Sequence, residues 1–171
     1  MKKFFAVAAA AAMLLILAAC AQNENPAAQQ ETMRDTQQIA NPWTDCASKE
    51  EAAQLAGFDL AAPDAISGSG EKRYRVMTGE DVETIFEIDY AAGEDRAAYV
   101  RKAPGAEDIS GDYNVYAEAQ TVEAGAVSVT LKGNDGLAYL AVWTDGGYSY
   151  ALNVTAGLSR SDMAALVSEI R

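Results

Sequence analysis

The residues best suited to bind a charged ligand are six cations on two predicted strands. They are Lys72, Arg73, Arg75, Arg96, Arg101 and Lys102. An acidic strand is predicted between the two. Alternation of side chains places Arg73 and Arg75 on one solvent face. The same face carries three carboxylates and one further guanidinium, those of Glu83, Glu87, Asp89 and Arg101. The pattern predicts cross-strand ion pairs, each contributing roughly 0.2–1 kcal/mol. The alternative is that Arg73, Arg75 and Arg101 form a surface for an anionic ligand or a partner.

A second candidate surface is aromatic and lies late in the chain, with Tyr139, Trp143, Tyr148 and Tyr150. Residues 144–147, Thr-Asp-Gly-Gly, predict a tight hairpin turn between two apolar runs. Any two-residue loop there leaves these four rings on one face of the hairpin. Such a face is typical of core packing beneath a helix. If it is exposed, the same rings would offer a platform for a ligand or a partner.

The chain contains no histidine. This removes the commonest general base, the nucleophile arrangements that need it and nearly all catalytic zinc sites. A glycine-rich phosphate loop, a G-x-S-x-G elbow and a paired C-x-x-C motif are also missing from the sequence. Residues 134–136 and 145–147 look like fragments of calcium loops, but turn chemistry explains both. We therefore expect a protein that is not an enzyme, with no catalytic residues, cofactor or metal.

The first twenty residues have the layout of an export signal. Lys2 and Lys3 precede an apolar run that begins at Phe4 and ends at Leu17-Ala18-Ala19-Cys20. This ending resembles the lipobox of bacterial lipoproteins. The resemblance implies that residues 1–19 are a cleaved signal peptide and that the Cys20 sulfur carries a diacylglycerol. An uncleaved transmembrane anchor is the alternative, but residues 4–20 are shorter than the ~20 residues that a spanning helix prefers.

The lipobox resemblance implies a protein of the cell membrane, anchored by the lipid on Cys20 and facing the extracytoplasmic side. With Cys20 committed to lipid, Cys46 has no intrachain partner for a disulfide. Cys46 is either a small buried hydrophobe or a free thiol, and burial is favoured because no basic residue adjoins it in the sequence.

Composition divides the remaining chain into two parts. Residues 20–40 are rich in glutamine and asparagine and predict a flexible tether. Residues 41–171 predict a single domain. Without residues 1–19 the chain keeps 11 basic and 25 acidic side chains, a formal charge of −14. This charge repels phosphate backbones and anionic headgroups, so we expect no nucleic-acid partner and no membrane contact beyond the lipid.

Periodicity predicts the elements of the domain. Ser48 and Glu51 form a capping box at the start of a helix over 48–56. A second helix begins at Ser159 and carries an apolar stripe of Met163, Leu166, Val167 and Ile170. Between them a period of two predicts seven strands, at 72–78, 82–90, 96–103, 113–121, 126–132, 137–144 and 148–155.

These elements predict an α+β domain, with a seven-stranded antiparallel meander sheet and the N-terminal and C-terminal helices packed on one face. The turn before residue 137 is ambiguous. A three-residue loop over 134–136, with Gly136 left-handed, brings Val127, Val129 and Leu131 onto the face of Trp143, whereas an even loop would reverse them. Consistency of the apolar face favours three residues.

Four stretches of the sequence look like landmarks of a known family. They are residues 51–63 (EAAQLAGFDLAAP), 108–113 (DISGDY), 131–136 (LKGNDG) and 143–150 (WTDGGYSY). Together they resemble an uncharacterised domain of Gram-positive lipoproteins and of the extracytoplasmic part of anti-sigma-factor-like membrane proteins. The resemblance covers about residues 41–171. It implies an extracytoplasmic module of unknown function, with no catalytic residues to carry over.

The sequence thus favours a lipid-anchored extracytoplasmic domain that binds or senses an unknown protein or small-molecule ligand without enzymatic activity. The alternative is a carrier or chaperone for lipid or other apolar cargo, because a curved antiparallel sheet covered by helices on one face can enclose an apolar cavity.

Overall fold

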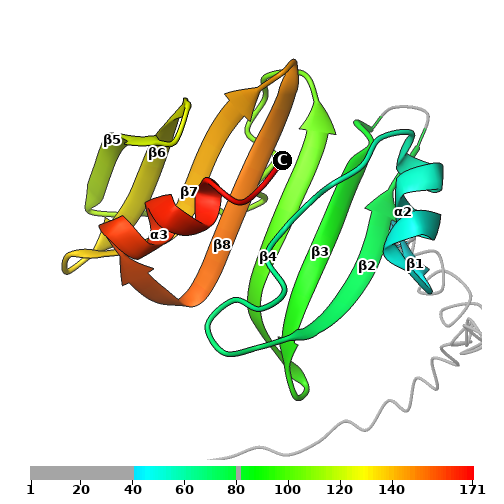
Figure 1. Cartoon of the computed structure of the whole chain (residues 1–171), viewed down its shortest axis with the longest axis horizontal. Coiled ribbons are helices and arrows are strands. Elements are labelled where there is room, and N and C mark those ends of the chain that lie inside the picture. The colour runs from blue at the N-terminus through cyan, green and yellow to red at the C-terminus, as the bar shows by residue number, and fades with distance from the viewer. Residues whose placement is uncertain (1–40, 80–81) are drawn as a thin grey trace, which may run out of the picture. The chain divides into compact units, whose positions relative to one another are not determined.

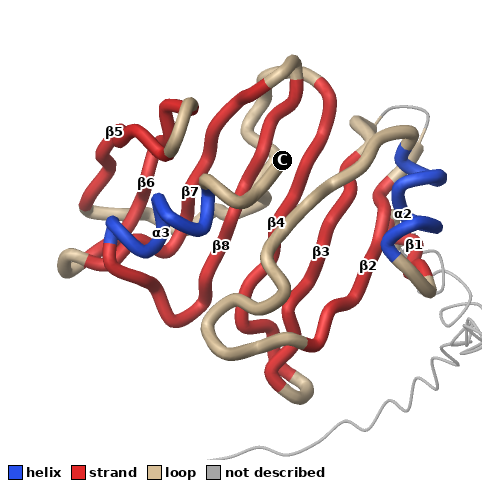
Figure 2. Tube along the Cα trace, in the orientation of Figure 1, coloured by secondary structure: helices blue, strands red, loops and turns tan. Residues whose placement is uncertain are grey.

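The computed structural model of the chain describes residues 41–79 and 82–171. The signal peptide, Cys20 and the tether predicted at residues 1–40 lie outside the described residues. Strands make up most of the described chain, and the two helices are short (Figures 1 and 2). The domain is α+β, as predicted.

The sheet has eight strands, one more than predicted. They are β1 (Trp43–Cys46), β2 (Glu71–Met77), β3 (Ile85–Ala92), β4 (Asp95–Pro104), β5 (Glu118–Ala124), β6 (Val127–Asn134), β7 (Leu137–Asp145) and β8 (Tyr148–Ser159). The additional strand is β1, whose four residues are too few to show a period of two. The helices are α2 (Lys49–Ala56) and α3 (Arg160–Val167).

The strand order β1-β2-β3-β4-β8-β7-β6-β5 corrects the prediction of a single meander. The sheet consists of two antiparallel meanders, β1–β4 and β5–β8, which join where β4 pairs with β8 (Figure 1). After β4 the chain therefore crosses to the far edge of the sheet through residues 105–117. We call this segment the strap. The predicted strand over 113–121 is wrong in its first half, because β5 begins only at Glu118.

Both helices begin at the predicted serines. The Ser48 hydroxyl accepts a hydrogen bond from the Glu51 N–H (3.2 Å), and the Glu51 carboxylate accepts one from the Ala47 N–H (2.7 Å). Gly57, with φ of 83°, ends α2 in the left-handed conformation that glycine adopts without strain. The Ser159 hydroxyl accepts from the Asp162 N–H (3.1 Å) at the start of α3. Neither helix of the described residues is long and apolar enough to cross a bilayer.

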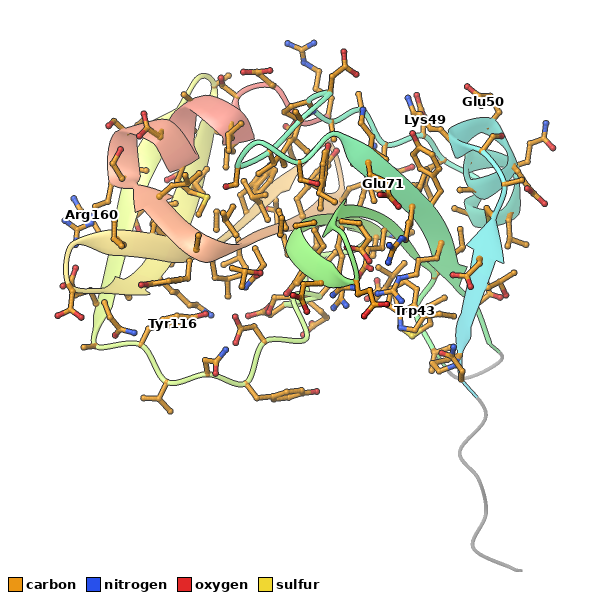
Figure 3. All side chains as sticks on the ribbon, turned by 90° about the horizontal axis from the view of Figure 1, so that it is seen from below. Trp43, Lys49, Glu50, Glu71, Tyr116 and Arg160 are labelled. Carbon is orange, nitrogen blue, oxygen red and sulfur yellow. The ribbon has the colours of Figure 1, made fainter. Side chains whose placement is uncertain are left out.

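The main hydrophobic core covers one face of the sheet, which we call the core face. Phe86, Val100, Leu152 and Trp143 contribute to it from β3, β4, β8 and β7. The helices add further buried members to the same cluster: Ala52 from α2 and Met163 and Val167 from α3. The opposite face, with Arg75, Glu87, Asp89, Tyr99 and Arg101, we call the polar face. Figure 3 shows the strap segment that carries Tyr116 on the lower side of the sheet.

A bulge sets the apolar face of β6, and the predicted three-residue loop is wrong. Asn134 pairs with Leu137, so the loop consists of Asp135 and Gly136 alone, with φ of 52° and 78°. The register shifts instead between Lys132 and Gly133. Lys132 pairs with Leu140 and Gly133 with Ala138, so Tyr139 of β7 is an extra residue. An extra residue reverses the alternation just as an odd loop would, so Val129 and Leu131 still join the core that contains Trp143.

Candidate functional site

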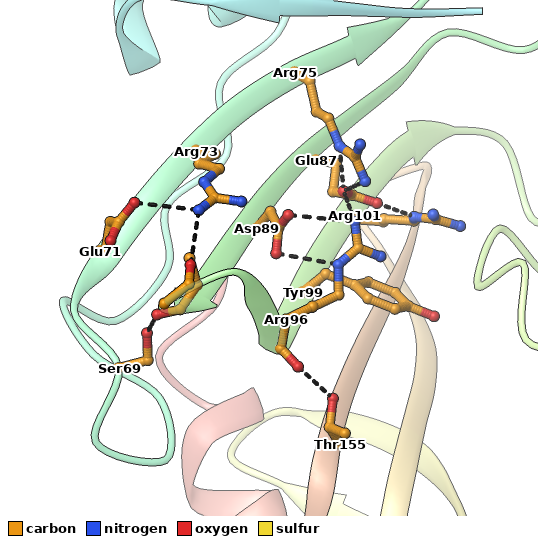
Figure 4. Close-up of polar contacts among 12 residues, drawn as sticks. Ser69, Glu71, Arg73, Arg75, Glu87, Asp89, Arg96, Tyr99, Arg101 and Thr155 are labelled. Atoms are coloured by element: carbon orange, nitrogen blue, oxygen red, sulfur yellow. Dashed lines mark hydrogen bonds and ion pairs between the residues drawn. The ribbon is translucent and has the colours of Figure 1, made fainter. Parts of the chain in front are cut away.

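The polar face centres on Glu87, a carboxylate on β3 whose side chain has no exposed surface. Arg75 of β2 and Arg101 of β4 lie directly opposite Glu87 on the two neighbouring strands. The Nε–H groups of Arg75 and Arg101 donate to Oε1 and Oε2 of Glu87, each at 2.7 Å. Three adjacent strands thus present one buried carboxylate between two guanidinium groups (Figure 4).

Arg96 is the third guanidinium of this cluster. Its Nη2 donates to Glu87 Oε1 at 3.0 Å, and its Nε donates to Asp89 Oδ1 at 3.1 Å. Simple alternation from Arg101 would put Arg96 on the core face. The register shift between Tyr90 and Ala91 pairs Arg96 with Ala91, and so turns its side chain to the polar face. We call Arg75, Arg96 and Arg101 the guanidinium triad.

Two aromatic rings hold the triad in place. The Tyr99 ring lies 5.0 Å from the Arg96 guanidinium carbon and 4.6 Å from that of Arg101. The Trp43 ring lies 4.9 Å from Arg75 and 5.2 Å from Arg101. In cation–π contacts of this kind, the face of the aromatic ring attracts the charged guanidinium and stabilises its position above the ring. Burial raises the pKa of Tyr99 to about 12, so the Tyr99 hydroxyl keeps its proton at neutral pH.

The strap is anchored to the polar face by hydrogen bonds to its backbone. Arg101 Nη1 donates to the carbonyl oxygens of Ile109 (3.1 Å) and Ser110 (2.6 Å). The Tyr99 hydroxyl donates to the same Ser110 carbonyl at 2.7 Å. The Ile109 side chain packs in a small apolar cluster with Ile85, Ala103 and Ala151 of the sheet. Arg101 therefore links Glu87 to the strap.

Asp112 anchors the second half of the strap. Asn153 Nδ2 of β8 and the Tyr116 hydroxyl both donate to Asp112 Oδ2, at 3.2 and 2.6 Å. The Asn114 N–H donates to Asp112 Oδ1 at 2.8 Å. Desolvation alone would raise the pKa of Asp112, but these hydrogen bonds outweigh it and hold the pKa below its ordinary value. Burial and the Asp112 carboxylate raise the pKa of Tyr116 to about 12.

A groove of about 420 Å³ runs beside this part of the strap, lined by Tyr99, Gly111, Asp112, Tyr113, Asn114 and Asn153. A second groove of about 240 Å³ lies at the start of the strap, between Glu107 and side chains of β6, β7 and β8 that include Thr130 and Ser149. Tyr113 and Val115, on the strap itself, are 95 % and 94 % exposed. Hydrogen bonds at Asp112 and Tyr116 hold the strap around these two exposed side chains.

The structure separates the predicted aromatic surface from the polar face. Trp143 and Tyr150 are 6 % and 5 % exposed, pair directly across β7 and β8, and stack at 5.1 Å in the main core. Tyr148 is half-buried and packs on Phe58 at 5.3 Å. Tyr139 differs from the prediction, because it falls at the register shift between Ala138 and Leu140. It stacks on Tyr116 of the strap at 6.3 Å and is not part of the Trp143 core.

The predicted cation cluster is also only partly assembled. Arg73 lies beside the triad but pairs with Glu71 at 3.4 Å. Lys72 pairs with Asp64 at 3.1 Å. Lys102 points into the core face, where its Nζ donates to the Asp59 carbonyl at 2.7 Å and lies 4.5 Å from the Tyr148 ring centre. Burial lowers the pKa of Lys102.

Several residues of this face are missing from the sequence-based candidates, namely Trp43, Tyr99, Asp112 and Asn153. Arg96 belonged to the basic cluster, but no local pattern marks the bulge that turns it. Asp112 and Asn153 meet only because the strap crosses the sheet, which follows from the strand order. Tyr99 alone had a sequence signal, since it shares the parity of Arg101 on a predicted strand.

Cys46 is half-buried and packs against the main core. Burial, together with Glu51 and Asp45, raises the pKa of its thiol, which disfavours the reactive thiolate. Within residues 41–79 and 82–171, acidic and cysteine side chains form no cluster suited to a metal ion.

Comparison of the chain with models of protein families, with curated proteins and with solved structures gave no match. The resemblance to the lipoprotein domain family therefore stays a prediction from the sequence.

Proposed function

We propose that the protein is a lipid-anchored, extracytoplasmic binding domain without enzymatic activity, and that it binds its ligand or partner on the polar face. The groove of about 420 Å³ beside the strap carries this proposal. Asp112 and Asn153 are fixed in its wall by hydrogen bonds to each other and to the strap, and Tyr113 stands exposed at its rim. Preorganised polar groups beside an exposed aromatic ring are typical of a recognition site.

The core face also favours a binding domain over a carrier of apolar cargo. The proposal takes both helices as covers of one face of the sheet, which fits their shared core of Ala52, Met163 and Val167. Trp143 and Tyr150 fill the space beneath with their own stacked rings. Apolar cargo would have to displace these side chains, at a cost comparable to that of disrupting a packed core.

A photocrosslinking experiment tests the binding face without knowledge of the ligand. p-Benzoylphenylalanine is incorporated at Tyr113 in the full chain, expressed in its own cells. The control places it at Leu55, which is 45 % exposed on α2. We expect a discrete adduct from position 113 and none from position 55. Equal adducts from both positions, or none from position 113, would contradict the proposal.

Two further outcomes would favour other functions. Native mass spectrometry of the gently extracted protein would support the carrier if an acyl ligand copurified with the domain, beyond the covalent lipid on Cys20. Saturable turnover of a metabolite, abolished by a single carboxylate substitution, would establish an enzyme.

The anchoring part of the proposal rests on the lipobox-like ending at Cys20. Replacing Cys20 with serine removes the thiol that would accept the diacylglycerol. We expect Cys20→Ser to abolish incorporation of labelled fatty acid, while Cys46→Ser, which removes the other thiol, leaves the labelling intact. Continued labelling of Cys20→Ser would refute the anchor.

A further inference from the structure

We propose that the guanidinium triad forms a binding site for an oxyanion, that is, a phosphate or carboxylate group. This inference rests on the proposed function, because it names a chemical group that the ligand of the polar face would carry. Alternation in the sequence places Arg75 and Arg101 on one face, and only the register shift on β4 adds Arg96 to them.

The first observation is an excess of positive charge. Three guanidinium groups surround two carboxylates, Glu87 and Asp89, whose side chains are 0 % and 10 % exposed. The nearby Arg73 forms an ion pair with Glu71, so these two residues add no net charge to the cluster. Among the described residues, the triad therefore has one more charge than the carboxylates within ion-pairing distance of it, in a chain whose formal charge is −12. The nearest strand neighbour with a carboxylate on this face is Asp45, which lies opposite Arg75 on β1 and makes no ion pair with it. Arg101 also binds the strap through Nη1, but the strap contributes only neutral carbonyl oxygens there, so this contact leaves the third guanidinium charge unmatched.

The second observation is that each arginine of the triad has one unused terminal nitrogen. Arg75 contacts Glu87 through Nε and Nη2, and Arg96 contacts the two carboxylates through the same pair of atoms. Arg101 uses Nε for Glu87 and Nη1 for the strap. Arg75 Nη1, Arg96 Nη1 and Arg101 Nη2 have no hydrogen-bond partner among the described residues. Since those residues contain no buried side-chain nitrogen without a partner, these three atoms are accessible to solvent.

The third observation is that the donors are held in place before any ligand arrives. All three guanidiniums contact one carboxylate, and the rings of Trp43 and Tyr99 cover them. The side chains of Arg75, Arg96 and Arg101 are only 23 %, 31 % and 12 % exposed. Ordering arginine side chains is one of the entropic costs of binding an anion, and here the fold has already met it.

The chemistry of the free atoms determines the ligand class. A guanidinium has only N–H donors, and its planar fork matches the paired oxygens of a carboxylate or a phosphate. The excess charge favours an anion over a neutral acceptor. Partial burial weakens competition from water and strengthens each charged hydrogen bond.

The test is a titration of the full chain with sodium phosphate and with sodium acetate, against sodium chloride at matched ionic strength. Arginine-selective NMR follows the Nε–H resonances. We expect phosphate or acetate to produce saturable shifts at Arg75, Arg96 and Arg101, with chloride producing none. Arg96→Gln should weaken the binding about tenfold or more, because one charged hydrogen-bond donor is lost.

The matched control is Arg160→Gln, which removes the same charge from a half-exposed arginine that pairs with Glu118 at the start of α3. This variant should bind phosphate as the wild type does. An equal loss of affinity in both variants would indicate nonspecific attraction and overturn the site. The site would also be overturned if the wild-type resonances responded to phosphate and acetate no more than to chloride. If Arg96→Gln fails to fold, the wild-type titration still decides.

This result is separable from the test of the proposed function. Crosslinking from Tyr113 without a response of the triad would refute the oxyanion site and leave the binding face standing. A response of the triad without crosslinking from Tyr113 would leave the oxyanion site standing and refute the binding site beside the strap.

Discussion

At the scale of single residues, Glu87 differs most from what alternation predicts. The period of two places Glu87 on a solvent face, where ion pairs contribute little. In the structure its side chain has no exposed surface and contacts three arginines. Removal of one partner from a buried pair costs about 3–5 kcal/mol, because an uncompensated charge is left behind. The cross-strand pairing itself was predictable, whereas the burial was not.

Trp143 is the residue whose replacement distinguishes a core from an exposed platform. Trp143→Ala leaves a cavity beside Tyr150 and should lower the free energy of unfolding by about 3–5 kcal/mol. Chemical denaturation measures this loss. The control Thr144→Ala alters the adjacent, exposed side chain and should change stability by less than about 0.5 kcal/mol. A small loss for Trp143→Ala would mean that its ring is not part of the core.

At the scale of elements, two bulges decide which side chains reach each face. The register shift at Lys132 and Gly133 aligns β6 with the core, and the shift opposite Tyr90 and Ala91 turns Arg96 to the polar face. Each shift inserts one residue, and one residue reverses the alternation of a strand.

Gly133 is required by close packing at the first of these bulges. A Cβ atom there would lie 1.8 Å from the Leu137 carbonyl oxygen, which belongs to the backbone and cannot move aside. Gly133→Ala should therefore disrupt the β6–β7 hairpin and destabilise the domain by more than Gly136→Ala. The Gly136 site has open space around it, and substitution there costs only the strain of a positive φ, about 1 kcal/mol. Equal losses in thermal unfolding would contradict this account of the bulge.

The strap should respond to pH through Asp112. Hydrogen bonds from Tyr116, Asn114 and Asn153 hold the folded-state pKa of Asp112 below its ordinary value of 3.8. A carboxyl group with a lowered pKa stabilises the fold in its ionised form, so this contribution is present above pH 3.8 and is lost as pH falls through the folded-state value.

Asp112→Asn should accordingly cost roughly 1–2 kcal/mol at neutral pH. The difference from wild type should stay constant down to about pH 5 and shrink toward pH 3. Urea unfolding at several pH values measures it. The exposed Asp95 supplies the control, and Asp95→Asn should change stability at neutral pH by less than about 0.5 kcal/mol. A difference in stability that grew on acidification would contradict a lowered pKa of Asp112 in the folded state.

At the scale of the whole molecule, the pairing of β4 with β8 makes two meanders into one sheet. Val100 and Leu152 face each other across this junction and are both fully buried. The main core extends from Val76 on β2 to Val129 on β6 without a break at the junction. The two halves should therefore unfold together.

The chain carries one tryptophan in each half, Trp43 on β1 and Trp143 on β7. In Trp43→Phe the fluorescence reports the second meander, and in Trp143→Phe it reports the first. Within each variant we expect the fluorescence and far-ultraviolet circular dichroism transitions in urea to coincide. If the fluorescence transition occurs at a lower urea concentration than the dichroism transition in one variant and at a higher one in the other, the meanders unfold as independent units.

Local patterns accounted for the parts of the fold that depend on local chemistry. Ser48, Glu51 and Gly57 mark the ends of α2, and the Gly146-Gly147 turn leaves Trp143 on the same face as Tyr150, as predicted. The face shared by Arg75, Glu87, Asp89 and Arg101 also followed from alternation. The sequence does not predict β1, because four residues are too short for a periodic signal. The period of two predicts a strand from residue 113, but the structure has strand only from Glu118.

The sequence alone therefore predicts the α+β class, the caps of both helices, the turn within residues 144–147 and the alternation that puts acidic and basic side chains on one face. These features arise from contacts between residues close in the chain. Three features emerge only from the three-dimensional fold: β4 pairs with β8, the strap crosses the polar face to bring Asp112 to Asn153, and a bulge adds Arg96 to the triad. Strand order and bulges depend on packing between distant segments, which no local pattern records.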